Sequence, residues 1–93
     1  MKINTLKKDN NIYFYVWLPA KLSDERRYKK GIATYIRYDS WDKNWDVYRT
    51  TVTVYSTGVE FGNGWNLYQN LTKSQAIGAA KNALKILIQG KLK

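Results

Sequence analysis

The side chains with the most chemical character in this chain are aromatic rings and basic groups, which gather in β-type segments. Flat rings stack on nucleobases and cationic groups contact phosphates, so this combination is typical of a nucleic-acid-binding surface. The same residue types are also enriched in protein interfaces. The residues predicted to form the binding surface are Tyr13, Tyr15, Trp17, Lys29, Lys30, Tyr35, Arg37, Trp41, Trp45, Arg49, Thr51 and Thr53.

The composition excludes several kinds of catalytic site. The 93 residues include no cysteine and no histidine, which excludes thiol nucleophiles, Cys/His zinc sites and histidine bases. No nucleophile–base pair is visible, so we predict a binding protein that is not an enzyme and needs no cofactor. Asp39, Asp42 and Asp46 lie close together in the sequence, but they are typical turn residues and we predict no metal site.

The net charge of +9, from 16 Lys and Arg against 7 Asp and Glu, indicates a polyanionic partner. Selection for solubility, or an AT-rich genome, would also raise the lysine content. We expect nucleic acid, with DNA favoured over RNA, and no membrane partner. No apolar run approaches the ~20 residues of a membrane-spanning helix. The N-terminus lacks the apolar stretch of a signal peptide, so the expected location is cytoplasmic.

Residues 12–18 are rich in aromatic and β-branched side chains and predict a strand that ends at Pro19. Its even-numbered residues are aliphatic or Phe and its odd-numbered ones are Tyr or Trp, so the two faces differ. Residues 20–30 are expected to form a charged loop, with one helical turn near Ser23.

Residues 32–41 and 45–56 predict a hairpin around the loop 42–44. This loop places Trp41 opposite Trp45, Arg37 opposite Arg49 and Tyr35 opposite Thr51. The other face then carries the aliphatic residues that we expect to pack on the helix together with those of the first strand. These residues are Ile12, Phe14, Val16, Leu18, Ile32, Ile36, Val52 and Val54. A one-residue slip would reverse the faces.

A short strand at 59–61 and a Gly-Asn-Gly turn follow, and residues 65–68 form another strand or an extended approach to the helix. The helix is predicted to begin at the N-cap Thr72, with Gln75 completing a capping box, and to end at Gly90. Its apolar stripe is Ala76, Ile77, Ala80, Ala83, Leu84, Leu87 and Ile88.

These elements predict the α+β class: an antiparallel β-sheet of three to five strands with one C-terminal α-helix packed on one face. We expect a single domain over residues 1–93, with loose ends at about 1–9 and 90–93. Because one helix covers one face, we expect the aromatic face to be exposed. Alternatively, residues 57–68 or a second copy in a homodimer cover it, and the aromatic residues then stabilise the sheet.

The C-terminal half, with its hairpin, Gly58, Phe61, glycine-rich turn and the helix from Leu71, resembles the arm-type and AP2-like DNA-binding domains of tyrosine recombinases. In those domains three strands lay one face in the DNA groove and a C-terminal helix backs the sheet. The helix is also similar to the last helix of double-stranded-RNA-binding (dsRBD) domains. The chain departs from both families by its extra N-terminal strand. The arm-type resemblance implies that Arg37 and Arg49, with Tyr35, Thr51 and Thr53, face the groove.

The function expected from these observations is a small basic nucleic-acid-binding module encoded by a phage or another mobile element. The alternative is a phage-type inhibitor of a host defence nuclease, similar in role to an anti-CRISPR protein. In that case the same face would contact a host protein or nucleoprotein complex.

Overall fold

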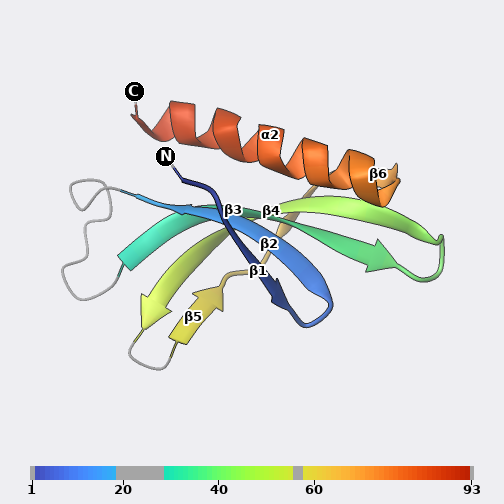
Figure 1. Cartoon of the computed structure of the whole chain (residues 1–93), viewed down its shortest axis with the longest axis horizontal. Coiled ribbons are helices and arrows are strands. Elements are labelled where there is room, and N and C mark those ends of the chain that lie inside the picture. The colour runs from blue at the N-terminus through green and yellow to red at the C-terminus, as the bar shows by residue number, and fades with distance from the viewer. Residues whose placement is uncertain (1, 19–28, 56–57, 93) are drawn as a thin grey trace.

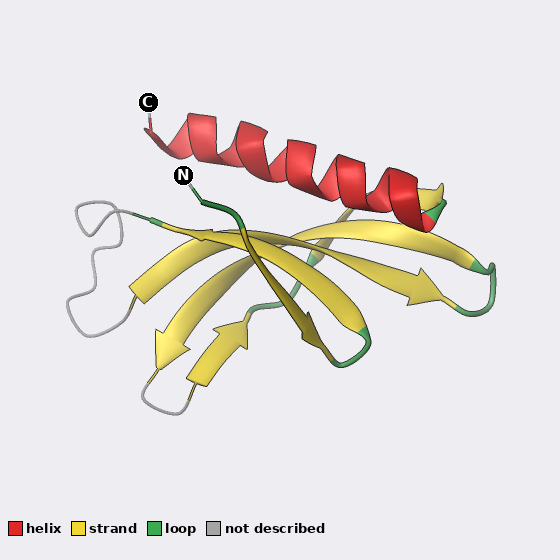
Figure 2. Ribbon diagram, in the orientation of Figure 1, coloured by secondary structure: helices red, strands yellow, loops and turns green. Residues whose placement is uncertain are grey.

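Six antiparallel strands form one curled sheet, and one helix lies across one of its faces (Figures 1 and 2). The computed structural model describes residues 2–18, 29–55 and 58–92. In this part of the chain the strand order is β1-β2-β3-β4-β5, and β6 also pairs with β4. The predicted α+β class is confirmed. The elements are β1 Asn4–Lys8, β2 Asn11–Trp17, β3 Lys29–Asp39, β4 Asn44–Tyr55, β5 Gly58–Phe61, β6 Trp65–Leu71 and α2 Lys73–Leu92.

Three segments are more regular than predicted: the first residues of the chain, the start of β3 and the end of α2. Residues 4–8 form β1, which pairs along β2, because a strand as apolar as β2 needs a neighbour on that edge. Lys29 and Lys30 begin β3 and do not belong to a loop. Helix α2 continues through Gly90, which does not adopt the positive φ of a helix-ending glycine. The helical turn expected near Ser23 lies outside the described residues.

The β3–β4 hairpin has a different register from the predicted one. Arg37 lies opposite Asp46 and not opposite Arg49, a shift of three residues. The cause is the turn, where the Asp39 carboxylate Oδ1 accepts hydrogen bonds from the backbone N–H of Trp41 (2.9 Å) and Asp42 (3.3 Å). Lys43, with a φ of 56°, completes this turn. Because the shift is an odd number of residues, every side chain of β4 points to the face opposite to the predicted one.

The core between sheet and helix reflects this register. Val47 faces α2 beside Ile36, whereas Val52 is buried on the other face. The prediction that Val52 and Val54 pack on the helix was therefore wrong. The other six residues predicted to pack on the helix do so, which confirms that part of the prediction. Ile12 and Leu18 are half-buried against the core. The buried core consists of Phe14, Val16, Ile32, Ile36 and Val47 from the sheet with Ala76, Ala80, Leu84 and Ile88 from α2.

Helix α2 begins as predicted and packs closely on the sheet. The Thr72 hydroxyl accepts a hydrogen bond from the N–H of Gln75 (3.2 Å), and the Gln75 side chain accepts one from the N–H of Thr72 (3.1 Å). The fully buried Thr34 on β3 donates its hydroxyl hydrogen bond to the carbonyl oxygen of Ala80 (2.8 Å). The small Ala80 side chain lets the two backbones approach. No helix in the described ranges is long and apolar enough to cross a membrane.

The sheet curls so far that its outer strands meet. Although three strands separate β1 from β5 in the sheet order, the Nζ of Lys8 donates a hydrogen bond to the carbonyl oxygen of Val59 (3.4 Å). The ring of Tyr13 on β2 stacks on that of Phe61, with centroids 3.8 Å apart. Gly31 allows β3 to approach β2 closely, since a Cβ there would collide with the carbonyl oxygen of Val16. In Figure 1, β1 and β5 both bend away from α2.

The packing of the core predicts different costs for the same substitution at two isoleucines. Ile36 is fully buried, so Ile36→Ala should lower the free energy of unfolding by about 2–5 kcal/mol. Ile86 on α2 is 60% exposed, so Ile86→Ala should change it by less than about 0.5 kcal/mol. Urea unfolding followed by circular dichroism measures both. Equal costs would contradict the placement of Ile36 under the helix.

Candidate functional site

The predicted aromatic face exists, but it lines the inside of the curl. Tyr13 lies opposite Tyr35 in the β2–β3 ladder, and Tyr15 and Trp17 follow on the same face. All four are half-buried. Phe61 stacks on Tyr13 and meets Tyr15 edge-on at 5.9 Å, so β5 covers part of this face. Of residues 57–68, which the alternative placed over this face, Phe61 and Gly64 lie against it in the structure.

Tyr35 lies at the centre of this aromatic interior. Its ring stacks on that of Tyr48, with centroids 4.9 Å apart. Burial raises the pKa of Tyr35, and the neighbouring Tyr13 and Tyr48 add to the effect. The chain after β5 passes close to its hydroxyl, because a Cβ on Gly64 would collide with it. These contacts give the rings a structural role and leave little room for a base to stack.

The remaining predicted site residues are divided among other surfaces. Trp45, Arg49, Thr51 and Thr53 lie on the helix side of β4 because of the shifted register, and Lys30 lies opposite Thr53. Three other predicted residues lie apart from these and from one another. Trp41 is 90% exposed at the hairpin tip. The Nζ of Lys29 lies 5.1 Å from the centroid of the Trp17 ring, and Arg37 is exposed at the far end of β3. The prediction of one continuous surface was wrong.

The structure brings together a different set of aromatic and basic side chains at the start of α2. The Nζ of Lys73 lies 5.5 Å from the centroid of the Trp45 ring, and Tyr38 lies against the same ring at 5.4 Å. Beside them is a shallow depression of about 330 Å³, here called the Trp45 basin. Its lining residues are Lys7, Lys8, Asp9, Asn10, Asn11, Ile12, Trp45 and Lys73.

The sequence contained a signal for this basin that was missed. Asp9 and Asn10 have φ values of 53° and 67°, as the two central residues of a type I′ hairpin turn have. An Asp-Asn pair between two segments in which polar and apolar residues alternate predicts such a turn. It would have placed β1, and with it Lys7, beside β2.

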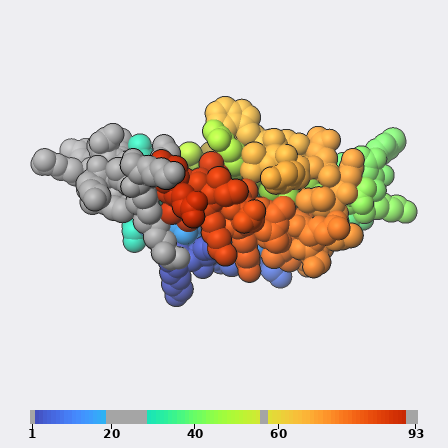
Figure 3. Space-filling model, turned by 90° about the horizontal axis from the view of Figure 1, so that it is seen from above, coloured from blue at the N-terminus to red at the C-terminus, as the bar shows by residue number. Residues whose placement is uncertain are grey.

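Lysines continue from the basin along one flank of α2. The Nζ of Lys81 lies 5.6 Å from the centroid of the buried Phe14 ring, and Lys85 borders a depression with Ile3 and Ile88. We call Lys7, Lys73, Lys81 and Lys85 the cationic flank. In Figure 3, seen from above α2, the blue β1 lies along one side of the helix and β6 along the other. Asp9 is the acidic residue that lines the Trp45 basin. No Asp or Glu follows Glu60 in the sequence.

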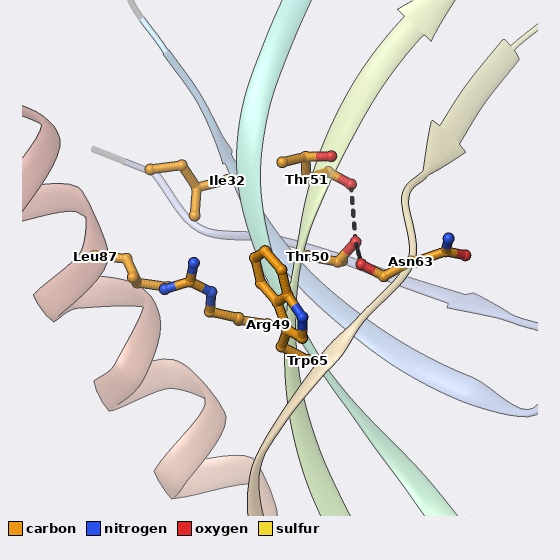
Figure 4. Close-up of a pocket in the computed structure, with 7 residues that line it drawn as sticks. All are labelled: Ile32, Arg49, Thr50, Thr51, Asn63, Trp65 and Leu87. Carbon is orange, nitrogen blue, oxygen red and sulfur yellow. Dashed lines mark hydrogen bonds between the residues drawn. The ribbon is translucent and has the colours of Figure 1, made fainter.

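A second depression lies on the other flank of α2 and is drawn in Figure 4. The guanidinium carbon of Arg49 lies 4.8 Å from the centroid of the Trp65 ring, and Trp65 is 68% exposed. The depression has a volume of about 190 Å³ and is here called the Arg49 groove. Its lining residues are Ile32, Arg49, Thr50, Thr51, Asn63, Trp65 and Leu87.

The carboxylates near the hairpin are engaged in local structure. Asp39 caps the turn, and the Oδ1 of Asp46 accepts a hydrogen bond from the N–H of Asn70 (3.2 Å). Among the described residues no three His, Cys, Asp or Glu side chains gather as metal ligands would.

No protein-family model, curated protein or solved structure matches the chain. The resemblance to arm-type and AP2-like domains stays a prediction. The two arginines that it placed together in a DNA groove, Arg37 and Arg49, lie on opposite faces of the sheet.

The closure of the aromatic interior can be tested at Phe61. Phe61→Ala removes the stack on Tyr13 and the edge contact with Tyr15, so it should lower the free energy of unfolding by at least about 1 kcal/mol. The control Glu60→Ala changes the exposed neighbour and should cost less than about 0.5 kcal/mol. Denaturant titration of both variants measures the difference. A neutral Phe61→Ala would show that β5 does not close the sheet in solution.

Proposed function

We propose that this protein binds nucleic acid, with DNA favoured over RNA, through the cationic flank and the Trp45 basin. The observation that carries this proposal is the segregation of charge. Lysines of α2 and β1 line one side of the molecule, and α2 itself contains no carboxylate that could neutralise them. The charged residues from position 61 onward are Lys73, Lys81, Lys85, Lys91 and Lys93.

The spacing of the lysines suits a polyanion. Lys73 and Lys85 are separated by about 18 Å along the helix axis, at 1.5 Å per residue. Duplex DNA carries one negative charge per ~1.7 Å, so this length faces about ten phosphate charges. Lys81 and Lys85 are one helical turn apart and project to the same side. The flank therefore offers several phosphate contacts within one docking site.

The aromatic rings of the basin supply a second kind of contact. Trp45 presents ring surface next to Lys7 and Lys73, and Tyr38 lies against the same ring. This is the pairing that stacking on a base and contact with its phosphate require. Trp41, which is 90% exposed at the hairpin tip, is a further ring open to a partner. The predicted site residues Trp41 and Trp45 are thus retained in the proposal, on a different face.

A protein partner is the second candidate, and the β6 strand favours it. Residues 65–71 carry no charge, and Trp65, Leu67 and Tyr68 are exposed. An uncharged edge strand can add a strand from another chain. This candidate includes the phage-type inhibitor of a host nuclease and the homodimer. The cytoplasmic location and the phage or mobile-element origin stay predictions.

The salt dependence of DNA binding tests the proposal. If the four lysines of the cationic flank each neutralise one phosphate, log K against log salt should have a slope of about −3.6 on duplex DNA. Lys81→Ala and Lys85→Ala should each weaken binding for all sequences and make the slope shallower by about 0.9. Fluorescence anisotropy with a labelled duplex at several salt concentrations measures both quantities.

Lys29→Ala is the matched control, because it removes the same charge from the opposite face of the sheet. It should leave the slope unchanged. Absence of binding at low salt would exclude the nucleic-acid proposal and favour the protein partner. The same change in slope for all three variants would show that net charge, and not the flank, determines binding.

A further inference from the structure

Arg49 lies against the Trp65 ring on the helix side of the sheet. The two residues lie opposite each other on β4 and β6, and the guanidinium lies over the indole ring at 4.8 Å. At this distance the ring attracts the guanidinium through a cation–π interaction. In Figure 4 the side chain of Arg49 extends toward Leu87 on α2, along the groove. The N–H groups therefore point into the groove between helix and sheet.

No carboxylate of the described residues pairs with this guanidinium. Within residues 2–18, 29–55 and 58–92, the Trp65 ring is the interaction that Arg49 makes, and no carboxylate lies at ion-pair distance. Arg49 is half-buried, so its five donors are not all freely hydrated. The planar arrangement of these donors matches the two oxygens of a carboxylate or phosphate. The guanidinium therefore has donors available for the oxyanion of a bound molecule.

The other residues that line the groove favour an apolar or flat group next to the oxyanion. Ile32 from β3 and Leu87 from α2 line the groove with aliphatic surface, beside the Trp65 ring. Its volume of about 190 Å³ is below the ~300–1,000 Å³ of sites that take a whole small molecule. It has room for one planar group. Asn63 borders the groove with its backbone, whose carbonyl oxygen accepts a hydrogen bond from the Thr50 hydroxyl (3.3 Å), and its side-chain amide points away from Arg49 and Trp65 (Figure 4).

We propose that the Arg49 groove binds one unpaired nucleotide of a nucleic acid, with its phosphate on Arg49 and its base against the exposed Trp65 ring. This inference rests on the nucleic-acid binding proposed above, and it assigns single-stranded segments to the groove. A paired base cannot enter, because its faces are already stacked within the duplex. The groove and the cationic flank lie on opposite sides of α2, so a duplex and an adjoining single strand can bind at the same time.

Nuclear magnetic resonance of the ¹⁵N-labelled full chain tests the inference directly. The chain has four tryptophans, whose indole N–H signals can be assigned with single Trp→Phe variants. A ten-nucleotide thymidine strand should shift the Trp65 indole and Arg49 Nε–H signals in a saturable way. An abasic strand of the same length should bind at least about fivefold more weakly, since stacking of the base is lost.

A substitution that keeps the charge separates the groove from general electrostatics. Arg49→Lys loses the planar donors and the ring stack, so single-strand affinity should fall about fivefold or more. Affinity for a blunt duplex and its salt dependence should stay unchanged. Trp65→Phe keeps a ring and should lose less affinity than Trp65→Ala. The control Tyr68→Ala alters an exposed residue of the same strand that does not line the groove, and it should have no effect.

Each other outcome overturns the inference in a recognisable way. Binding of the single strand without a shift at Trp65, or equal binding of the abasic strand, removes the groove as a nucleotide site and leaves the proposed function standing. A response only to a short peptide with a free C-terminal carboxylate and an apolar last residue assigns the groove to protein recognition. If no nucleic acid binds to the protein and none binds to the lysine variants, the proposed function is overturned as well.

Discussion

A sheet of this size has two faces to shield from water, and the described chain has a single helix with which to cover them. The second face is covered by the sheet itself, which curls until the ring of Phe61 stacks on that of Tyr13. This constraint explains the close approach at Gly31 and the passage of Gly64 beside Tyr35. It also explains why the most aromatic surface predicted from the sequence has a structural role.

The parts of the fold that depend on neighbours in the sequence could be predicted, and the parts that depend on distant contacts could not. The capping box of Thr72 and Gln75 and the apolar stripe of α2 are local patterns. The capping box is confirmed, and so are all residues of the stripe except Ala83. The hairpin register depends on which polar residue caps the turn. Because Asp39 caps it, Trp45 and Arg49 lie on the helix side of the sheet. β1 has few strand-forming residues and is a strand because β2 pairs with it.

The candidate sites differ from the predicted one because they also depend on contacts between distant parts of the chain. The excess of lysine was visible in the composition, but its concentration on one flank arises only when β1 and α2 lie side by side. Trp65 had no partner in the sequence pattern, and its stack on Arg49 follows from the pairing of β6 with β4. Helix α2 separates two chemically distinct surfaces, because Lys81 and Lys85 lie on one flank while Leu87 faces the other.

The side-chain closure of the sheet has a consequence for the order in which the protein folds. The strands β2, β3 and β4 follow each other along the chain as antiparallel neighbours, although residues 19–28 separate two of them. The contact between Lys8 and Val59, in contrast, joins residues that are 51 positions apart. Contacts at such separation carry a larger loop-closure entropy, so we expect them to form after the central ladders. The same edge can detach without breaking a backbone ladder between β2, β3 and β4. Amide hydrogen exchange is therefore expected to be slowest in β3 and β4 and fastest in β5.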